Sequence, residues 1–367
     1  MERTKAAAEV FSLNASGKGH APGGMPDGPL CSVVIPTYNG RTLLERCLES
    51  VARHRPADPR VSVEVIVADD ASTDGTASWL AHAHPDVRVI KLEQNGGFCA
   101  AANAGIAAAR GRFIQLLNND TEVTAGWIEA GLAPFGDPTI VSVAPLVLVR
   151  SDPGRVDSAG DSYSLAGWPT KRGHGQPREL FATRAPEEVF GASGSSAFYR
   201  SAALRRVGGY DPLLGSYYED VDLAFRLRWA GYRCVFAPEC VIHHDVSATY
   251  DHGSPALQRR MARNAEIVFW ANMPAGLLTL ALVPHLTFVT LQAAWRLARG
   301  RLRPFLLGKY DALRAWPEIK ERRASRSRIA RKAVARPHFA LGSGSIQDVR
   351  NHLNRPAESS SAIQSFR

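Results

Sequence analysis

The chain has 367 residues, of which 45% are hydrophobic and 22% charged, a composition typical of a globular protein with a sizeable core and not of a disordered chain. Its length suits one large domain or two ordinary ones. The net charge of +9 is concentrated between Arg296 and Arg336, where fourteen basic residues face three acidic ones, and the remainder carries −2. The basicity is therefore a C-terminal feature suited to anionic lipid or nucleic acid, and no general polyanion-binding character is expected of the body.

The ends of the chain and its five cysteines carry little functional information. Residues 1–28 lack the apolar core of a signal peptide and are expected to be a disordered lead-in. The cysteines are odd in number and show no CxxC spacing, so reduced, buried thiols in a cytosolic protein are expected.

Residues 31–120 alternate apolar strand patterns with helical ones. Strands separated by single helices predict an α/β fold with a mostly parallel sheet covered on both faces. The expected strands are the apolar run of CSVVIPTYNG (31–40), which ends at a Pro and an Asn-Gly turn, then VSVEVIVADD (61–70), VRVIKL (87–92) and FIQLLNND (113–120), and the expected helices are 41–54, 75–84 and 98–111.

Polar side chains follow three of these strands where each strand ends. In parallel sheets ligands bind outside the carboxyl ends of the strands, so these segments are expected to crowd one edge. They are Thr37-Tyr38-Asn39, Asp69-Asp70 and Asn118-Asn119-Asp120.

The second half of the chain contains a long irregular segment and then further elements. Residues 151–190 have weak periodicity and predict a long excursion or flap. A helix is expected over 221–232 and a pair of strands over 233–245, with the globular domain closing near residue 255.

Residues 267–295 carry no formal charge and are long enough to span a bilayer. Pro274 and Pro284 weaken that interpretation, so an interfacial or re-entrant helix, a true span and a buried core helix remain alternatives. The basic run that follows fits a segment attracted to anionic lipid. The tail after Arg336 is predicted to be polar and disordered.

Each group of acidic residues has a structural interpretation, as part of a turn or a helix cap, and a functional one. Asp69-Asp70 can accept hydrogen bonds from base or ribose donors or form a turn, and Asp120 can bind a hard cation or belong to an Asn/Asp turn. Glu219, Asp220 and Asp222 can cap a helix, although one that faces the cleft can act as a general base. Adjacent strand residues point to opposite faces, so at most one of His243 and His244 can reach a shared site.

Six motifs in order resemble the family 2 glycosyltransferases of the GT-A fold, within them the bacterial rhamnosyltransferase-like group. The resemblance covers about residues 31–255. The motifs are VVIPTYNG, VIVADDASTDGT, NGGFCAAANAGIAAARGRFIQLLNNDTEV, GASGSSAFYRSAALRRVGGYDPLL, YYEDVDLAFRLRWAGY and VIHHDVSAT.

The resemblance implies a role for each matching residue. The implied nucleotide-binding residues are Pro36, Thr37, Tyr38, Asn39, Asp69, Asp70, Asn95, Gly96, Gly97 and Asn119. Asp120 would bind the metal ion, Mg²⁺ or Mn²⁺, together with His244 or, less clearly, His243. Asp220 would be the inverting base with Glu219 beside it, and Gly191, Ala192, Ser193, Gly194 and Asp222 would shape the sugar and acceptor pocket.

Two positions depart from the family pattern. Ala71 replaces the glycine usual after the aspartate pair, and Asn118 replaces the first aspartate of the metal motif, which puts bidentate chelation in doubt. Metal affinity without nucleotide is therefore expected to be poor.

The resemblance and the C-terminal composition together predict the organisation and partners of the chain. A GT-A domain is expected over 29–255, an apolar and then basic helical membrane-associating extension over 256–336, and the polar tail over 337–367. The expected partners are a nucleotide-diphospho-sugar donor, a glycan or lipid-linked acceptor of cell-surface polysaccharide synthesis, and the cytoplasmic face of the plasma membrane; nucleic acid is not favoured. The alternatives are another nucleotide-sugar-binding enzyme, such as a nucleotidyltransferase, and a non-catalytic membrane assembly protein.

Overall fold

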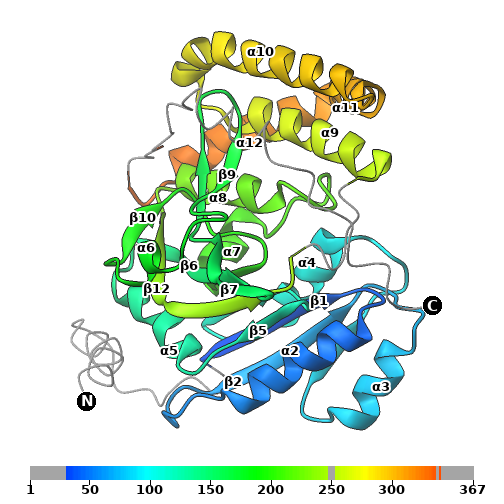
Figure 1. Cartoon of the computed structure of the whole chain (residues 1–367). Coiled ribbons are helices and arrows are strands. Elements are labelled where there is room, and N and C mark those ends of the chain that lie inside the picture. Colours follow the sequence, from blue (N-terminus) through cyan, green and yellow to red (C-terminus); the bar gives the residue numbers. More distant parts are fainter. Residues whose placement is uncertain (1–29, 247–252, 336–338, 340–367) are drawn as a thin grey trace.

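The predicted strands form one mixed sheet in the computed structural model, which describes residues 30–246, 253–335 and 339. Among these residues the strand order is β10-β12-β6-β11-β4-β1-β2-β3, with β5 joined to β12 and β7 to β6 (Figure 1). The predicted lead-in 1–28 and nearly all of the tail 337–367 lie outside the described residues. The strands are β1 (Cys31–Thr37), β2 (Val63–Asp69), β3 (Arg88–Lys91), β4 (Phe113–Leu117), β5 (Thr121–Val123), β6 (Ile140–Val149), β7 (Asp152–Ser158), β10 (Glu187–Val189), β11 (Ser196–Arg200) and β12 (Arg233–His244).

The N-terminal half of the sheet is parallel, as predicted. Strand β1 pairs in parallel with β2 and with β4, and Thr37 at the end of β1 lies opposite Asp69 at the end of β2. The carboxyl ends of these strands therefore meet at one edge, which confirms the α/β fold expected from the alternation.

The sheet divides the core into two apolar layers because successive side chains of a strand point to opposite faces. Val33 and Ile35 of β1 belong to one layer and Val34 to the other, and all three are fully buried. Gly105 lets α4 approach β1 closely, since a Cβ there would lie 2.3 Å from Val34 Cγ1. The covering helices are α2 (Arg41–Arg53), α3 (Thr76–Ala83), α4 (Phe98–Ala108), α5 (Trp127–Leu132), α7 (Ser201–Val207) and α8 (Glu219–Trp229), with a 3₁₀ turn η1 (Ala133–Gly136) after α5.

Two elements differ from the sequence prediction. The segment 151–190 is not a structureless flap: it contains β7, β10, a short helix α6 (Glu179–Ala182) and a hairpin of β8 (Asp161–Tyr163) and β9 (Pro169–Lys171). Strands β8, β9 and β10 have three residues each, and β7 begins with Asp-Pro-Gly, so none of them produces a clear apolar alternation. The expected strand pair over 233–245 is a single strand, β12, whose register against β6 shifts between Ala237 and Val241.

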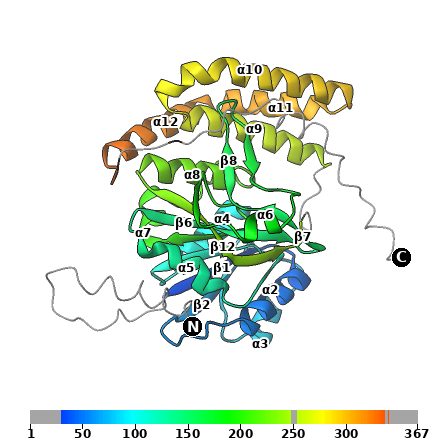
Figure 2. The same cartoon turned by 60° about the vertical axis from the view of Figure 1, so that its left-hand side comes forward.

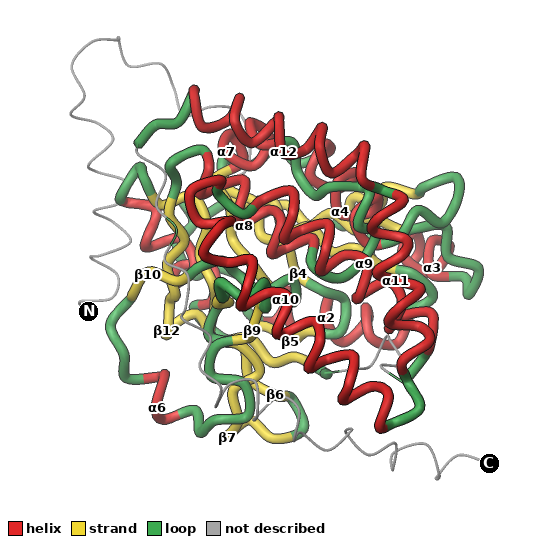
Figure 3. Tube along the Cα trace, turned by 90° about the horizontal axis from the view of Figure 1, so that it is seen from above, coloured by secondary structure: helices red, strands yellow, loops and turns green. Residues whose placement is uncertain are grey.

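Four C-terminal helices form a layer over one side of the sheet domain, with α10 outermost (Figures 1 and 2), and they also cover it in the view from above (Figure 3). The charge-free run 267–295 is broken at Pro274, whose ring fixes φ and which has no N–H to donate. Its first part, Ile267–Ala271, is buried against Phe225 of α8 in a third apolar cluster. The helices are α9 (Pro255–Asn272), α10 (Ala275–Ala298), α11 (Leu302–Arg314) and α12 (Trp316–Arg331).

Candidate active site

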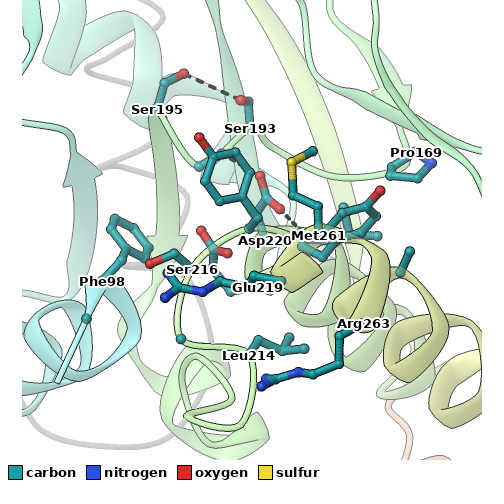
Figure 4. A pocket seen from close by; sticks show the side chains of 18 of the residues that line it. Phe98, Pro169, Ser193, Ser195, Leu214, Ser216, Glu219, Asp220, Met261 and Arg263 are labelled. Atoms are coloured by element: carbon teal, nitrogen blue, oxygen red, sulfur yellow. Dashed lines mark hydrogen bonds between the residues drawn. The ribbon is translucent and has the colours of Figure 1, made fainter. Parts of the chain in front are cut away.

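A cavity of about 1190 Å³ lies at the carboxyl ends of β1, β2 and β4, beneath the C-terminal helices. Figure 4 shows part of its wall, with Phe98 on one side, Glu219 and Asp220 at the centre and Met261 of α9 on the other. The predicted residues that line the cavity are Pro36, Thr37, Tyr38, Asn39, Asp70, Asn95, Gly96, Gly97, Asn118, Asn119, Asp120, Ser193, Gly194, Glu219, Asp220 and His244.

At the end of the cavity beside β1 and β2, side chains form hydrogen bonds with loop backbones and with one another. Both carboxylate oxygens of Asp70 accept hydrogen bonds at 2.8 Å, from the backbone N–H groups of Gly96 and Gly97. Asn39 adopts φ 47° and its Oδ1 accepts from the Thr73 N–H at 2.8 Å. Asn119 Nδ2 donates to Thr37 Oγ1 at 2.9 Å. These bonds fix a polar rim of amides and hydroxyls around this end.

Asp120 and His244 face each other because β5, which begins directly after Asp120, pairs antiparallel with the end of β12. His244 Nε2 lies 3.4 Å from Asp120 Oδ1, and His244 Nδ1 lies 3.0 Å from Asp157 Oδ2. Although burial opposes protonation, hydrogen bonds and charge from the two carboxylates raise the pKa of His244 to about 9. The imidazole is thus held in one orientation between two carboxylates.

The Glu219-Asp220 pair begins α8 after an unusual turn. Tyr217 and Tyr218 both have φ of 71°, a left-handed conformation that costs a non-glycine residue of the order of 1–3 kcal/mol. Asn264 of α9 is fully buried and holds this turn: its Nδ2 lies 2.9, 3.0 and 2.8 Å from the carbonyl oxygens of Leu214, Ser216 and Tyr217. The C-terminal helices therefore set the backbone on which the two carboxylates stand.

The environments of Glu219 and Asp220 separate their protonation. Burial, and then the charge of Asp220, raise the pKa of Glu219 well above its ordinary value. Burial also raises the pKa of Asp220, but backbone N–H groups oppose the shift, because Gly194 donates to Oδ2 and Val221 to Oδ1, each at 2.8 Å. Glu219 is therefore the carboxyl whose surroundings favour the neutral form, and Asp220, whose charged form accepts two backbone hydrogen bonds, is the candidate proton acceptor.

Three charged residues of the site, on β7 and the β8–β9 hairpin, were not predicted from the sequence. Asp157 is fully buried, and Lys171 Nζ donates to both of its oxygens, at 3.0 and 2.9 Å. Asp161 lines the cavity, and burial followed by the charge of Asp220 raises its pKa well above the ordinary value. No spacing in this Gly-rich segment distinguished these residues from ordinary turn residues.

Five predicted residues do not line the main cavity. Asp222 is buried and paired with Arg226 at 2.7 Å and Arg326 at 2.8 Å, so its role is to join α8 to α12. His243 alternates with His244 on β12 and lies opposite Glu122, which removes it from the candidate metal ligands. Asp69 is fully buried beside the rim, and its Oδ1 accepts from the Ser72 N–H. Gly191 and Ala192 line a small separate pocket behind Asp220.

Comparison with known proteins places these motifs in a family. A model described as "Glycosyl transferase family 2" matches residues 32–208, and one described as "Glycosyl transferase family group 2" matches residues 153–307. An N-acetylglucosaminyl-diphospho-decaprenol L-rhamnosyltransferase from Mycobacterium tuberculosis is 31% identical over 270 residues, which is 66% of this chain and 85% of the relative. The chain belongs to glycosyl transferase family 2.

A second relative of this glycosyl transferase family 2 chain is longer than the chain itself. Two solved structures share the fold of this chain. A pre-mycofactocin glycosyltransferase from Mycobacterium tuberculosis is 34% identical over 229 residues, 60% of this chain but only 44% of the relative. A mannosyltransferase from Pyrobaculum calidifontis, solved with GDP-Man and Mn²⁺, superimposes with a TM-score of 0.50 at 19% identity over 89% of this chain and 93% of that one. GalNAc-T7, solved with UDP, GalNAc and Mn²⁺, gives 0.51 at 19% identity over 71% and 55%. These likenesses confirm the GT-A fold.

The residues of this family 2 chain fit a divalent cation held by few protein donors. Within the described residues no three His, Cys, Asp or Glu side chains gather as a metal site. The Asp120 carboxylate and the His244 imidazole nonetheless form an oxygen–nitrogen donor pair, and Asp157 bonds the other ring nitrogen of His244 as metal-ligating histidines usually require. Two donors leave most of a coordination shell to other ligands.

Proposed function

We propose that this chain transfers a sugar, rhamnose being the first candidate, from a nucleoside diphosphate donor to a hydroxyl of a glycan or lipid-linked acceptor, with inversion at the anomeric carbon. The observation that carries the proposal is the shared cavity. The Asp220 carboxylate, the Asp120–His244 pair and the polar rim at β1 and β2 all line it. A single displacement needs a general base, a site for the cation and a polar region for the nucleotide, and these residues supply candidates for each.

The donor end of the proposal follows from the rim and the donor pair. The nucleotide would lie against Thr37, Asn39 and Asp70, and its diphosphate would approach Asp120 and His244. A bound Mg²⁺ or Mn²⁺ would supply Lewis-acid neutralisation of the leaving diphosphate. The two protein donors support the expectation that metal and donor bind together and that metal alone binds poorly.

Asp220 is proposed as the general base. Its carboxylate would take the proton of the attacking hydroxyl while the bond from the anomeric carbon to the diphosphate breaks. The backbone N–H groups of Gly194 and Val221 keep the carboxylate oriented in the cavity wall. Glu219, which retains its proton, can donate a hydrogen bond to a substrate oxygen.

Membrane association is proposed to use the outer side of α10 as an interfacial surface. Of the helices in the described ranges, α10 alone is long and apolar enough to cross a bilayer, with a mean hydropathy of 1.6. Its inner side, however, lines the cavity through Phe288, Val289 and Gln292, while Leu280 and Val283 on the outer side are 64% and 70% exposed. Such a helix, which covers the cavity with one side and exposes apolar side chains on the other, can lie parallel to a membrane surface. The basic residues around it would attract anionic lipid headgroups.

Donor and metal binding are testable together by thermal melting. A panel of nucleotide sugars with Mn²⁺ or Mg²⁺ is expected to raise the melting temperature by roughly 5 °C for the cognate donor at about 100 times its dissociation constant. Asp120→Asn should lose this metal-dependent shift because it removes the carboxylate of the donor pair. The matched control is Asp86→Asn, an exposed residue paired with Arg55 on the surface. A full shift in Asp120→Asn would remove Asp120 from the metal site.

A further inference from the structure

The cavity continues past Asp220 into a second region beneath α10. We call it the α10 lobe and define it by Met261 of α9, Phe288, Gln292 and Arg296 of α10, and Phe305 and Lys309 of α11. Tyr218, which directly precedes Glu219 in the chain, lines the same cavity. Burial raises the pKa of Tyr218 to about 12, the Arg296 charge opposes that rise, and Glu266 and Asp220 add to it. The lobe and the proposed base are therefore close neighbours.

The two cations of the α10 lobe differ in how they are neutralised. Lys309 Nζ is paired with Glu266 Oε1 at 2.5 Å, and Glu266 also lies 3.2 Å from His285 Nε2. Arg296 is half-buried, yet within the described residues no carboxylate pairs with it, and its guanidinium lies 4.5 Å from the ring centroid of Phe305. Burial lowers the pKa of Arg296, and the Tyr218 hydroxyl partly opposes that shift. Arg296 is therefore the cation of the α10 lobe that can bind an anionic ligand.

The chemistry around Arg296 selects an amphiphilic anion. A guanidinium binds phosphate oxygens through two parallel hydrogen bonds, which makes phosphate the anion it recognises best. Met261, Phe288 and Phe305 form an apolar wall beside the Arg296 guanidinium. The outer side of α10, the helix that carries Arg296, presents exposed leucines. A phosphate attached to a lipid chain satisfies both properties.

We propose that the α10 lobe binds the phosphate or diphosphate group of a lipid-linked acceptor, with Arg296 as its ligand. This inference rests on the proposed sugar transfer for the identity of the bound molecule as an acceptor. The lipid chain would leave the lobe toward the apolar outer side of α10, and the sugar attached to the phosphate would extend past Tyr218 toward Asp220. Arg296 would thus set the distance between the lipid phosphate and the accepting hydroxyl.

The test uses the full chain with geranyl diphosphate and geraniol as probes, titrated calorimetrically in EDTA so that no cation holds the diphosphate at Asp120. Wild type is expected to bind the diphosphate at least about tenfold more tightly than the alcohol. Arg296→Gln should remove this preference. Arg303→Gln, an exposed residue of α11 outside the cavity, is the matched control and should keep it. Far-ultraviolet circular dichroism confirms that each variant is folded.

Three results would overturn the proposal: no preference in wild type, an undiminished preference in Arg296→Gln, or an equal loss in Arg303→Gln. Flotation on phosphatidylglycerol vesicles separates acceptor phosphate from bulk headgroups. A flotation defect in Arg296→Gln with the diphosphate preference intact would assign Arg296 to bulk lipid and reject the acceptor site. The probes need no donor, so a failed donor screen and a failed preference are separate results.

Discussion

Asp220→Asn is expected to lower sugar transfer by about 10²–10⁴-fold, the range by which a positioned general base accelerates a reaction. The asparagine oxygen can still accept one of the two backbone N–H groups, that of Gly194, and loses only the bond from Val221 N–H, so the cavity wall is expected to keep its shape. Donor binding should be unchanged because Asp120 and the β1–β2 rim are untouched. Initial rates of product formation and the donor-induced melting shift, measured on the same preparation, check both parts.

Glu219→Gln provides the matched comparison for Asp220→Asn. Burial keeps Glu219 protonated, and glutamine has nearly the same shape as a protonated glutamic acid, so its loss of rate should be far smaller. Equal losses in the two variants would contradict the assignment of separate protonation states. Unchanged transfer in Asp220→Asn would remove Asp220 as the base.

Asn264→Asp should destabilise the chain by about 3 kcal/mol or more, because it would place a buried carboxylate oxygen against three carbonyl oxygens, while Arg263 Nε, which now donates to Asn264 Oδ1 at 3.1 Å, reaches only the other oxygen. These are the carbonyls of Leu214, Ser216 and Tyr217, which now accept from the amide. Tyr217 and Tyr218 would lose the bond that holds their strained conformation. Denaturant unfolding measures the stability, and transfer assayed well below the melting temperature measures the effect on Asp220.

Asn264→Ala separates the lost hydrogen bonds from the added repulsion. It removes the same amide without placing a charge there, so a smaller loss of about 1–3 kcal/mol is expected. If Asn264→Asp stayed within about 0.5 kcal/mol of wild type, the amide would not be the support of the tyrosine turn. If stability fell but transfer per folded molecule did not, the turn would not control the catalytic carboxylates.

Local patterns were sufficient to predict the N-terminal sheet. Strands β1 to β4 have four to seven residues with largely apolar interiors, and β1, β2 and β3 are each followed directly by a helix. The parallel arrangement then places Thr37, Asp70 and Asp120 at one edge without further information. This is why the rim of the cavity was predictable from the sequence.

Contacts between distant segments were not predictable in the same way. The alternation of strand residues could not choose between His243 and His244, and the preference for His244 came from the family resemblance; the pairing of β12 with β5 directs His244 toward Asp120. Asp157 lies on β7, whose residues DPGRVDS are mostly polar, and Lys171 on the three-residue strand β9, so both segments have the sequence pattern of a loop. Asp222 sits in the acidic run that begins α8, yet its pairing with Arg326 of α12 makes it a structural residue.

The C-terminal helices are the part whose role changed most. Their composition left an interfacial helix, a membrane span and a buried core helix as alternatives, whereas the structure shows that α9 supports the tyrosine turn through Asn264 and that α10 and α11 line the cavity. The predicted boundary near residue 255 coincides with the start of α9. Deleting the C-terminal helices would therefore expose the cavity and would also remove the apolar outer side of α10.

The central claim is a single displacement at the anomeric carbon with Asp220 as base. Its most direct test is the anomeric configuration of the product, measured by proton nuclear magnetic resonance on glycoside formed from the donor that the melting screen identifies. The account predicts a configuration opposite to that of the donor. Retention of the donor configuration would contradict it, because retention requires a different mechanism from one direct attack by an activated hydroxyl.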